Sequence, residues 1–302
     1  MNASILITVD VDDDYANSST KFMPLSWQSV ELCKVISDSI NSLACFATFF
    51  VRADQQIYNT FGDYAYMFYN HNSLWKYILS WGNEVAFHSH LIGKNSFARY
   101  VMQPVHEGLE NIDRSLDAVF KSGFHITSSR LSGFPMNDEL FTLINSYNIT
   151  HDSSCFPGFQ SQMQNCSTWP YRLTQPFKLN TLLGTQQQNL DIIEIPLLID
   201  DIKAPYDDKP KPRYINLTYH TKYFMKAIHN CHRQLSNNWP KSTHYYNLIM
   251  HPDEVNSHVH PGKHELYSFS LKTVIANISQ LLKFLESSYT SVKSETICKV
   301  IA

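Results

Sequence analysis

Short apolar runs alternate with longer amphipathic segments along most of this chain of 302 residues. The short runs are rich in β-branched and aromatic residues, which favours strands, whereas the longer segments repeat apolar residues at helical spacing. The clearest helix is predicted over 271–287, where one stripe contains Val274, Ile278, Leu281, Leu282 and Leu285. Such alternation is typical of an α/β fold built on a parallel sheet or barrel.

The pattern assigns most of the chain to predicted elements. We expect strands over 4–9, 44–51, 84–88, 125–129, 148–153, 191–195 and 246–251, with a further candidate at 291–295. Helices are expected over 27–40, 105–120, 138–147, 221–235 and 271–287. The length suits one α/β barrel domain, so we predict a single catalytic domain over residues 1–302. Segments 205–212 and 156–175 are predicted loops, which either shape a substrate groove or have no special role.

Composition narrows the class of protein. The chain is 43% hydrophobic and 17% charged, with a net charge of -3, and no basic cluster marks a nucleic-acid partner. No apolar run reaches the roughly 18–20 residues of a transmembrane helix, and the N-terminus lacks the features of a signal peptide, so we expect a cytoplasmic protein. The six cysteines are scattered and form no C-x-x-C motif, which favours reduced, structural thiols.

Polar residues gather where the predicted strands end, which is where parallel α/β folds hold their functional groups. Taken alone, an acidic cluster is usually a helix cap or a solvated turn, and a single Arg or His says little. Their order along the chain is more specific. The residues concerned are Asp10, Asp12, Asp13 and Asp14 after the first strand, His88 and His90 after the third, then Arg130, Asp152 and His251.

These residues lie within segments that resemble the polysaccharide deacetylase family, carbohydrate esterase family 4, also called the NodB-homology domain. The segments are, in order, ITVDVDDD, CFATFFV, WGNEVAFHSH, SSRLSGFPMNDELFTLINSYNITHDSS, NLDIIEIP and LIMHPDE, over roughly residues 3–255. The resemblance implies a distorted (β/α) barrel of about seven strands. It also implies a metal-dependent amide hydrolase that acts on an N-acylated sugar.

The resemblance also implies a role for each matching residue. Asp10 matches the catalytic base and Arg130 the arginine that braces it, while His251 resembles the catalytic acid and Asp152 the carboxylate that orients this acid. We expect the substrate to contact Phe134 and Pro135, which lie in the fourth matching segment.

The metal ligands implied by the resemblance are Asp12, with Asp13 as a rival, and His88. The second histidine of the family pattern would fall at Ile92, which cannot bind a metal, so His90 is the expected substitute. In an extended segment, side chains at i and i+2 lie on one face, so His88 and His90 can converge on one ion. The alternative is that His90 only lines the pocket.

Such a ligand set has a defined chemistry. Two imidazoles and a carboxylate leave open positions for water and a substrate carbonyl, as in catalytic zinc sites. Zn²⁺ is the expected ion, although Co²⁺, Ni²⁺, Mn²⁺ or Fe²⁺ could occupy the same donors.

The leading hypothesis is a sugar N-deacetylase that uses a nucleotide- or lipid-linked intermediate of surface polysaccharide biosynthesis. One alternative is a barrel metallohydrolase of the amidohydrolase type, but there the His-x-His pair follows the first strand. Another is a catalytically silent, carbohydrate-binding relative, against which the complete set of Asp10, Arg130, Asp152 and His251 argues.

Overall fold

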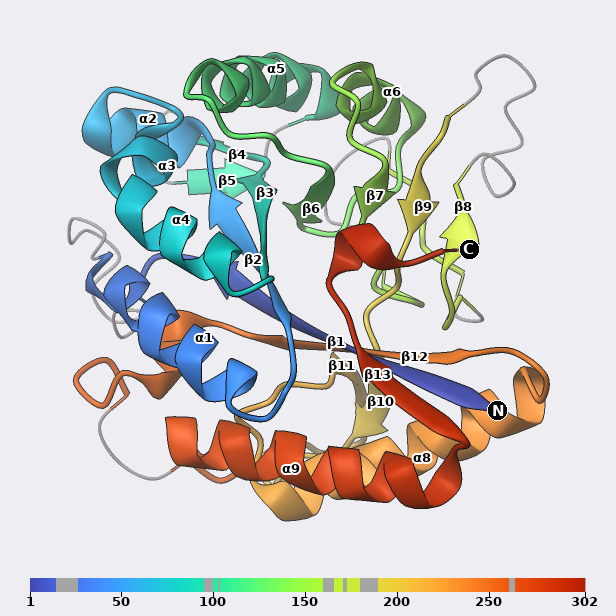
Figure 1. Cartoon of the computed structure of the whole chain (residues 1–302). Helices are drawn as coiled ribbons and strands as arrows, with labels where there is room; N and C mark the ends of the chain where they lie inside the picture. Colours follow the sequence, from blue (N-terminus) through green and yellow to red (C-terminus); the bar gives the residue numbers. More distant parts are fainter. Residues whose placement is uncertain are drawn as a thin grey trace. The chain divides into compact units, whose positions relative to one another are not determined.

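The chain forms a mixed α/β fold, as predicted (Figure 1). This computed structural model describes residues 1–14, 27–94, 100–102, 104–159, 166–170, 173–179, 190–260 and 264–301. The chain divides into two compact units. Unit 1 comprises Met1–Thr48, Trp81–Asn83 and Leu197–Thr296, and unit 2 comprises Phe49–Ser80, Glu84–Pro196 and Ile297–Ala302. The single catalytic domain over residues 1–302 stays a prediction.

Unit 1 is built around strand β1 (Asn2–Val11), in which every residue from Ala3 onward is buried. A strand that is buried on both faces is typical of a sheet covered on both sides. β1 pairs in parallel with β12 (His244–Met250) and with β13 (Ser291–Ser294). The other elements of unit 1 are η1 (Gln28–Glu31), α1 (Leu32–Asn41), β10 (Ile199–Ile202), β11 (Lys211–Tyr214), α8 (Thr221–Asn238), η2 (Pro252–Val255) and α9 (Leu271–Ser288).

Helices α8 and α9 pack side by side in unit 1 (Figure 1). α9 begins at its N-cap Ser270, whose side chain accepts a hydrogen bond from the Thr273 amide, and it buries Val274, Ile278 and Leu281. The predicted apolar stripe is therefore the buried face. Within the described part of the chain, no helix is long and apolar enough to cross a membrane.

Unit 2 contains the parallel strands β3 (Glu84–His90), β6 (Ser128–Ser132), β7 (His151–Asp152) and β9 (Ile193–Glu194). Along unit 2 the strands follow the order β2-β3-β6-β7-β9-β8, where β2 is Ala47–Arg52 and β8 is Phe177–Lys178. α5 and α6 lie side by side in unit 2 (Figure 1). The remaining elements are α2 (Gln55–Phe61), α3 (Tyr66–Asn70), α4 (Asn72–Ser80), β4 (Ile92–Lys94), β5 (Tyr100–Met102), α5 (Val105–Lys121), α6 (Asp138–Ser146), β8 (Phe177–Lys178) and η3 (Ile297–Lys299).

Several boundaries differ from the predictions. The strands expected over 148–153 and 191–195 shorten to β7 and β9, which have two residues each. The strand expected to end at 88 runs on to His90. Helices α2, α3 and α4 were not predicted, because Asn and Gly residues interrupt the apolar pattern between 57 and 80. β11 begins at Lys211, within the loop predicted over 205–212.

The predicted chemical state of the cysteines agrees with the structure, since all six are free thiols. Cys33, Cys45, Cys155 and Cys231 are buried, and burial raises the pKa of each of these thiols. In the loop predicted over 156–175, residues 160–165 and 171–172 lie outside the described part of the chain. The described remainder contains no helix or strand.

A cluster of His and Tyr side chains is buried in unit 1. His244 Nε2 donates to the Trp239 carbonyl at 2.8 Å, so His244 Nδ1 accepts the hydroxyl of Tyr289 at 2.5 Å. This neutral ring is completely buried, and burial lowers the pKa of His244 below its ordinary value. Burial also lowers the pKa of His232, which lies 3.0 Å from the same Tyr289 hydroxyl.

We predict that His244 makes the free energy of unfolding depend on pH. The pKa of His244 is lowered in the folded state. Below the ordinary pKa of about 6.5, the unfolded chain therefore takes up a proton that the buried ring resists, and the free energy of unfolding decreases as the pH falls. The stability advantage of the wild type over His244→Gln should therefore shrink between about pH 8 and about pH 5. Urea unfolding at several pH values measures this difference, and a difference independent of pH would contradict the prediction.

Candidate metal centre and catalytic site

The aspartates at the end of β1, among them Asp10, Asp12 and Asp14, have different surroundings. Asp10 is buried within β1, and the Asp12 amide donates to the Asp10 carbonyl at 3.0 Å in a tight turn. Asp14 accepts the backbone amides of Gln28 at 3.0 Å and Ser29 at 3.1 Å, at the start of η1. For Asp14 the ordinary reading of an acidic cluster, a helix cap, is therefore correct.

His251 directly follows β12 and lies beside two carboxylates of unit 1. Its Nδ1 is 3.4 Å from Glu254 Oε1, and its Nε2 is 3.9 Å from Asp12 Oδ2. Glu254 also accepts the His251 backbone amide at 2.9 Å and the side-chain amide of Asn216 at 2.7 Å. Glu254 therefore holds both the backbone and the ring of His251.

The carboxylates determine the charge of the His251 ring. Burial opposes the charged form, but the hydrogen bond and charge of Glu254, followed by the charges of Asp10 and Asp12, raise the pKa of His251 to about 10. The ring therefore carries a proton at neutral pH. Glu254 follows His251 at a spacing of three residues, and this spacing is the signal in the sequence that could have indicated the contact.

His88 has the environment of a metal-binding histidine. It is buried in β3 opposite Arg130 of β6, and its Nδ1 donates to the Arg130 carbonyl at 2.7 Å. A carbonyl can only accept a hydrogen bond, so the ring proton sits on Nδ1 and Nε2 is the acceptor, which faces Nε2 of His90 at 3.1 Å. Metal-binding histidines are oriented in the same way, through the nitrogen that does not bind the ion.

His90 lies on the same face of β3 as His88, as the spacing of two residues predicts. The Nε2 atoms of the two rings are 3.1 Å apart, with the ring planes nearly perpendicular at 89°. Two nitrogens bound to one tetrahedral zinc ion would be about 3.3 Å apart, given bonds of about 2.0–2.1 Å. The observed separation of 3.1 Å is close to that spacing, so both rings fit one ion.

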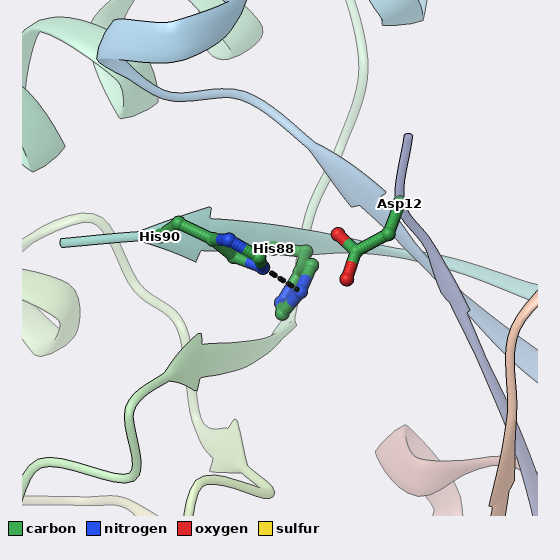
Figure 2. Close-up of side chains that lie close together, drawn as sticks. All are labelled: Asp12, His88 and His90. Atoms are coloured by element: carbon green, nitrogen blue, oxygen red, sulfur yellow. Dashed lines mark hydrogen bonds between the residues drawn. The ribbon is translucent and has the colours of Figure 1, made fainter. Parts of the chain in front are cut away.

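Asp12 is the candidate for a third ligand. One ligand atom from each of Asp12, His88 and His90 can be chosen so that all three lie within 4.8 Å of one another (Figure 2). The donor set is thus two imidazole nitrogens and one carboxylate, which suits a divalent transition metal. The sequence contains a second His-x-His pair, His258 and His260. Its surroundings differ, because His260 Nε2 lies 3.0 Å from Asp253 Oδ2 and the His260 ring stacks on Phe269.

Arg130 and Asp152 occupy the neighbouring strands of unit 2. Arg130 is buried, donates to the Ser153 carbonyl at 3.0 Å, and stacks over the Phe50 ring at 4.3 Å. Asp152 accepts hydrogen bonds from the Ser129 hydroxyl at 2.5 Å and the Ser154 amide at 2.8 Å.

A second buried carboxyl group stands next to Asp152. Glu194 is opposite Asp152 in the pairing of β7 with β9 and is completely buried. Burial, followed by the charge of Asp152, raises the pKa of Glu194 well above its usual range. Both effects favour the neutral form of Glu194 beside Asp152, a feature that the sequence alone did not indicate.

The predicted substrate contacts, Phe134 and Pro135, follow β6. Phe134 is half-buried with a positive φ of 50°, which is uncommon for a residue with a side chain. Its ring makes edge contacts with Phe156 at 5.2 Å and Phe159 at 5.4 Å, and its carbonyl accepts the Trp169 indole N–H. Pro135 is buried. Both residues stay predictions as substrate contacts.

The fold that presents these side chains is the polysaccharide deacetylase fold, which confirms the resemblance at the level of structure. A structure from Mycobacterium smegmatis, assigned as a polysaccharide deacetylase, matches with a TM-score of 0.55 at 14% identity, over 98% of this chain and 88% of the other. A Pseudomonas aeruginosa PAO1 structure, described as a probable polysaccharide deacetylase, matches with a TM-score of 0.50 at 8% identity, over 97% and 88%.

The structure of PuuE allantoinase is similar too, with a TM-score of 0.54 at 9% identity, over 97% of this chain and 87% of the other. At the level of sequence, no family model and no curated protein matches the chain. At these identities, the structural likeness defines the fold, and the chemistry has to be argued from the site.

We predict that Glu254→Gln lowers the pKa of His251 in the metal-free protein. The pKa should fall from about 10 toward the ordinary value of about 6.5, because the variant loses the nearest negative charge. The charges of Asp10 and Asp12 should keep it above that ordinary value. NMR titration of the histidine rings in chelator-treated protein measures the shift, with Glu286→Gln on the exposed face of α9 as the control. An unchanged His251 pKa in Glu254→Gln would contradict this account.

Proposed function

We propose that this protein is a metal-dependent N-deacetylase, an amide hydrolase that removes the acyl group from an N-acylated sugar. The observation that supports the proposal best is the pair of imidazole Nε2 atoms, 3.1 Å apart, with the His88 Nδ1 proton held on a carbonyl. The two nitrogens lie within hydrogen-bond distance of each other, where an ion could take the place of the shared proton, and Asp12 could add a carboxylate.

In this proposal Asp12, His88 and His90 hold a divalent ion, with Zn²⁺ as the expected one. Bound there, such an ion would lower the pKa of a water toward about 7 and polarise the acyl carbonyl. The nitrogen-rich donor set fits Zn²⁺, Co²⁺ or Ni²⁺ better than Mg²⁺ or Ca²⁺, which prefer oxygen ligands.

The remaining side chains move and orient protons. Asp10 acts as the base that takes a proton from the attacking water, and Arg130 braces this base according to the family resemblance. His251 acts as the acid that donates a proton to the departing nitrogen. The contact of Glu254 with His251 Nδ1 supports this role, since it keeps the ring charged and directs Nε2 to the site. Asp152 assists the acid according to the family resemblance, and in this chain Glu254 shares that task.

The fold shared with proteins described as polysaccharide deacetylases supports an N-acylated sugar as the proposed substrate class. A nucleotide- or lipid-linked sugar, a role in surface polysaccharide assembly and a cytoplasmic location remain predictions from the sequence. A second candidate is hydrolysis of a small cyclic amide, because PuuE allantoinase is as similar in fold as the deacetylase-like structures. Both candidates break a carbon–nitrogen bond, so one assay panel can separate them.

We predict about one equivalent of transition metal per chain, lost in His88→Ala and in His90→Ala, because each variant removes one of three donors. Elemental analysis after reconstitution and desalting measures the content. His258→Ala is the matched control, since it removes an exposed histidine of the second His-x-His pair. Metal retained in His90→Ala would reduce His90 to a pocket-lining residue, and no metal in the wild type would overturn the proposal.

We predict that the metal-loaded protein releases acetate from N-acetylated sugars, and that Glu254→Gln lowers kcat by roughly 10–100-fold with little change in KM. The variant impairs the acid of the chemical step, and a positioned acid contributes about 10²–10⁴-fold. The panel should contain N-acetylated sugar nucleotides, N-acetylated oligosaccharides and allantoin. Turnover of allantoin alone would favour the second candidate, and sugar binding without turnover would favour a catalytically silent relative.

A further inference from the structure

The backbone of the His-x-His segment is held from the side of β2 by two hydrogen bonds of different kinds. The Ala53 amide donates to the His88 carbonyl at 2.9 Å, which continues the pairing of main chains. Two residues later, the His90 amide donates to the side chain of Asp54, with 3.1 Å between the nitrogen and Oδ2. The carboxylate thus holds the backbone of the second candidate ligand.

This carboxylate takes the place of a main-chain acceptor. In a parallel ladder the bonds are evenly spaced, so the amide two residues after His88 would normally meet the next carbonyl of the adjacent strand. β2 ends at Arg52 and α2 begins at Gln55, so the chain turns away from β3 at this point. Asp54 fills the gap with its side chain, and β3 stays extended through His90.

Asp54 is itself held tightly. The guanidinium of Arg52 donates to Asp54 Oδ2 at 2.6 Å and to the Gln56 side-chain oxygen at 2.5 Å. Asp54 Oδ1 accepts the amides of Gln56 at 2.9 Å and Ile57 at 3.1 Å, as the N-cap of α2. Arg52 and Asp54 are almost completely buried, with relative exposures of 0% and 1%. A buried ion pair with its hydrogen bonds satisfied is a rigid support.

We propose that Asp54 is a positioning residue for metal binding, acting through the His90 backbone. This inference rests on the proposed function, and it explains how ligands two residues apart can serve a site where the family pattern has them four apart. An extended backbone at His90 directs its ring to the same face as the His88 ring. Loss of the Asp54 acceptor leaves only the pairing with β6 to hold the backbone extended after His88, so the two imidazoles can move apart.

The test replaces the acceptor with a donor of the same size. In Asp54→Asn the Oδ1 position can still cap α2, while an NH₂ group at the Oδ2 position opposes the His90 amide. We expect Co²⁺ affinity to fall by roughly 10–100-fold, the usual cost of losing a group that orients a metal ligand. We also expect a changed visible absorption spectrum of the bound Co²⁺, because the coordination geometry changes.

Two further variants separate positioning from stability. The double variant Arg52→Gln with Asp54→Asn removes both buried charges. It presents the same side-chain NH₂ group to the His90 amide, but it leaves no unpaired guanidinium. We expect the same loss of Co²⁺ affinity as in Asp54→Asn alone. Asn137→Ala removes the N-cap side chain of α6. This side chain accepts the backbone amides of Glu139 and Leu140, as Asp54 does for the first amides of α2. This control should lower the unfolding midpoint without altering Co²⁺ affinity or spectrum.

The outcomes discriminate between the proposals. Wild-type affinity and spectrum in folded Asp54→Asn and in the double variant would overturn the positioning role and leave the proposed function intact. Failure of the wild type to bind Co²⁺ at all would overturn the proposed function, and the positioning role with it. An equal loss of affinity in Asn137→Ala would show that the effect comes from general destabilisation and would also overturn the positioning role.

Discussion

The extended backbone of β3 through His90 is the constraint on which the candidate metal centre depends. Alternate side chains of a strand point to the same face, so His88 and His90 share a target only while the chain stays extended. Hydrogen bonds from both sides hold this conformation. β6 pairs with β3 as far as His90, and Ala53 and Asp54 supply the partners on the other side.

Carboxylates near the candidate site have distinct roles because their neighbours differ. Asp14 caps η1, Asp54 supports β3 and Glu254 holds His251, so each meets backbone amides or a cation in its own unit. Asp12 is partly exposed and offers an oxygen to the histidine pair. Glu194 is buried beside another carboxylate, and both burial and the charge of Asp152 raise its pKa.

Much of this organisation could be predicted from local pattern. The 3.6-residue period located α5, α6, α8 and α9, and runs of β-branched and aromatic residues located the long strands β1, β3 and β12. Strands of two residues, such as β7 and β9, carry too few positions for a period to appear. Helices α2 to α4 have irregular apolar spacing and are stabilised by tertiary packing, as buried Trp75 and Phe68 illustrate.

The sequence by itself determined the order of the elements, the chemical identity of the candidate ligands and the spacing that puts His88 and His90 on one face. These properties are local, because they depend on residue type and on separation along the chain. The tertiary structure alone decided which nitrogen of His88 carries the proton, and which carboxylate supports His90 or contacts His251. The contacts of His88 and His90 depend on partners 42 and 36 residues away. The contact of Glu254 with His251 depends on the direction of a local turn, which the residue types do not determine. A hydrogen bond between distant segments follows from the complete fold and leaves no period in the sequence.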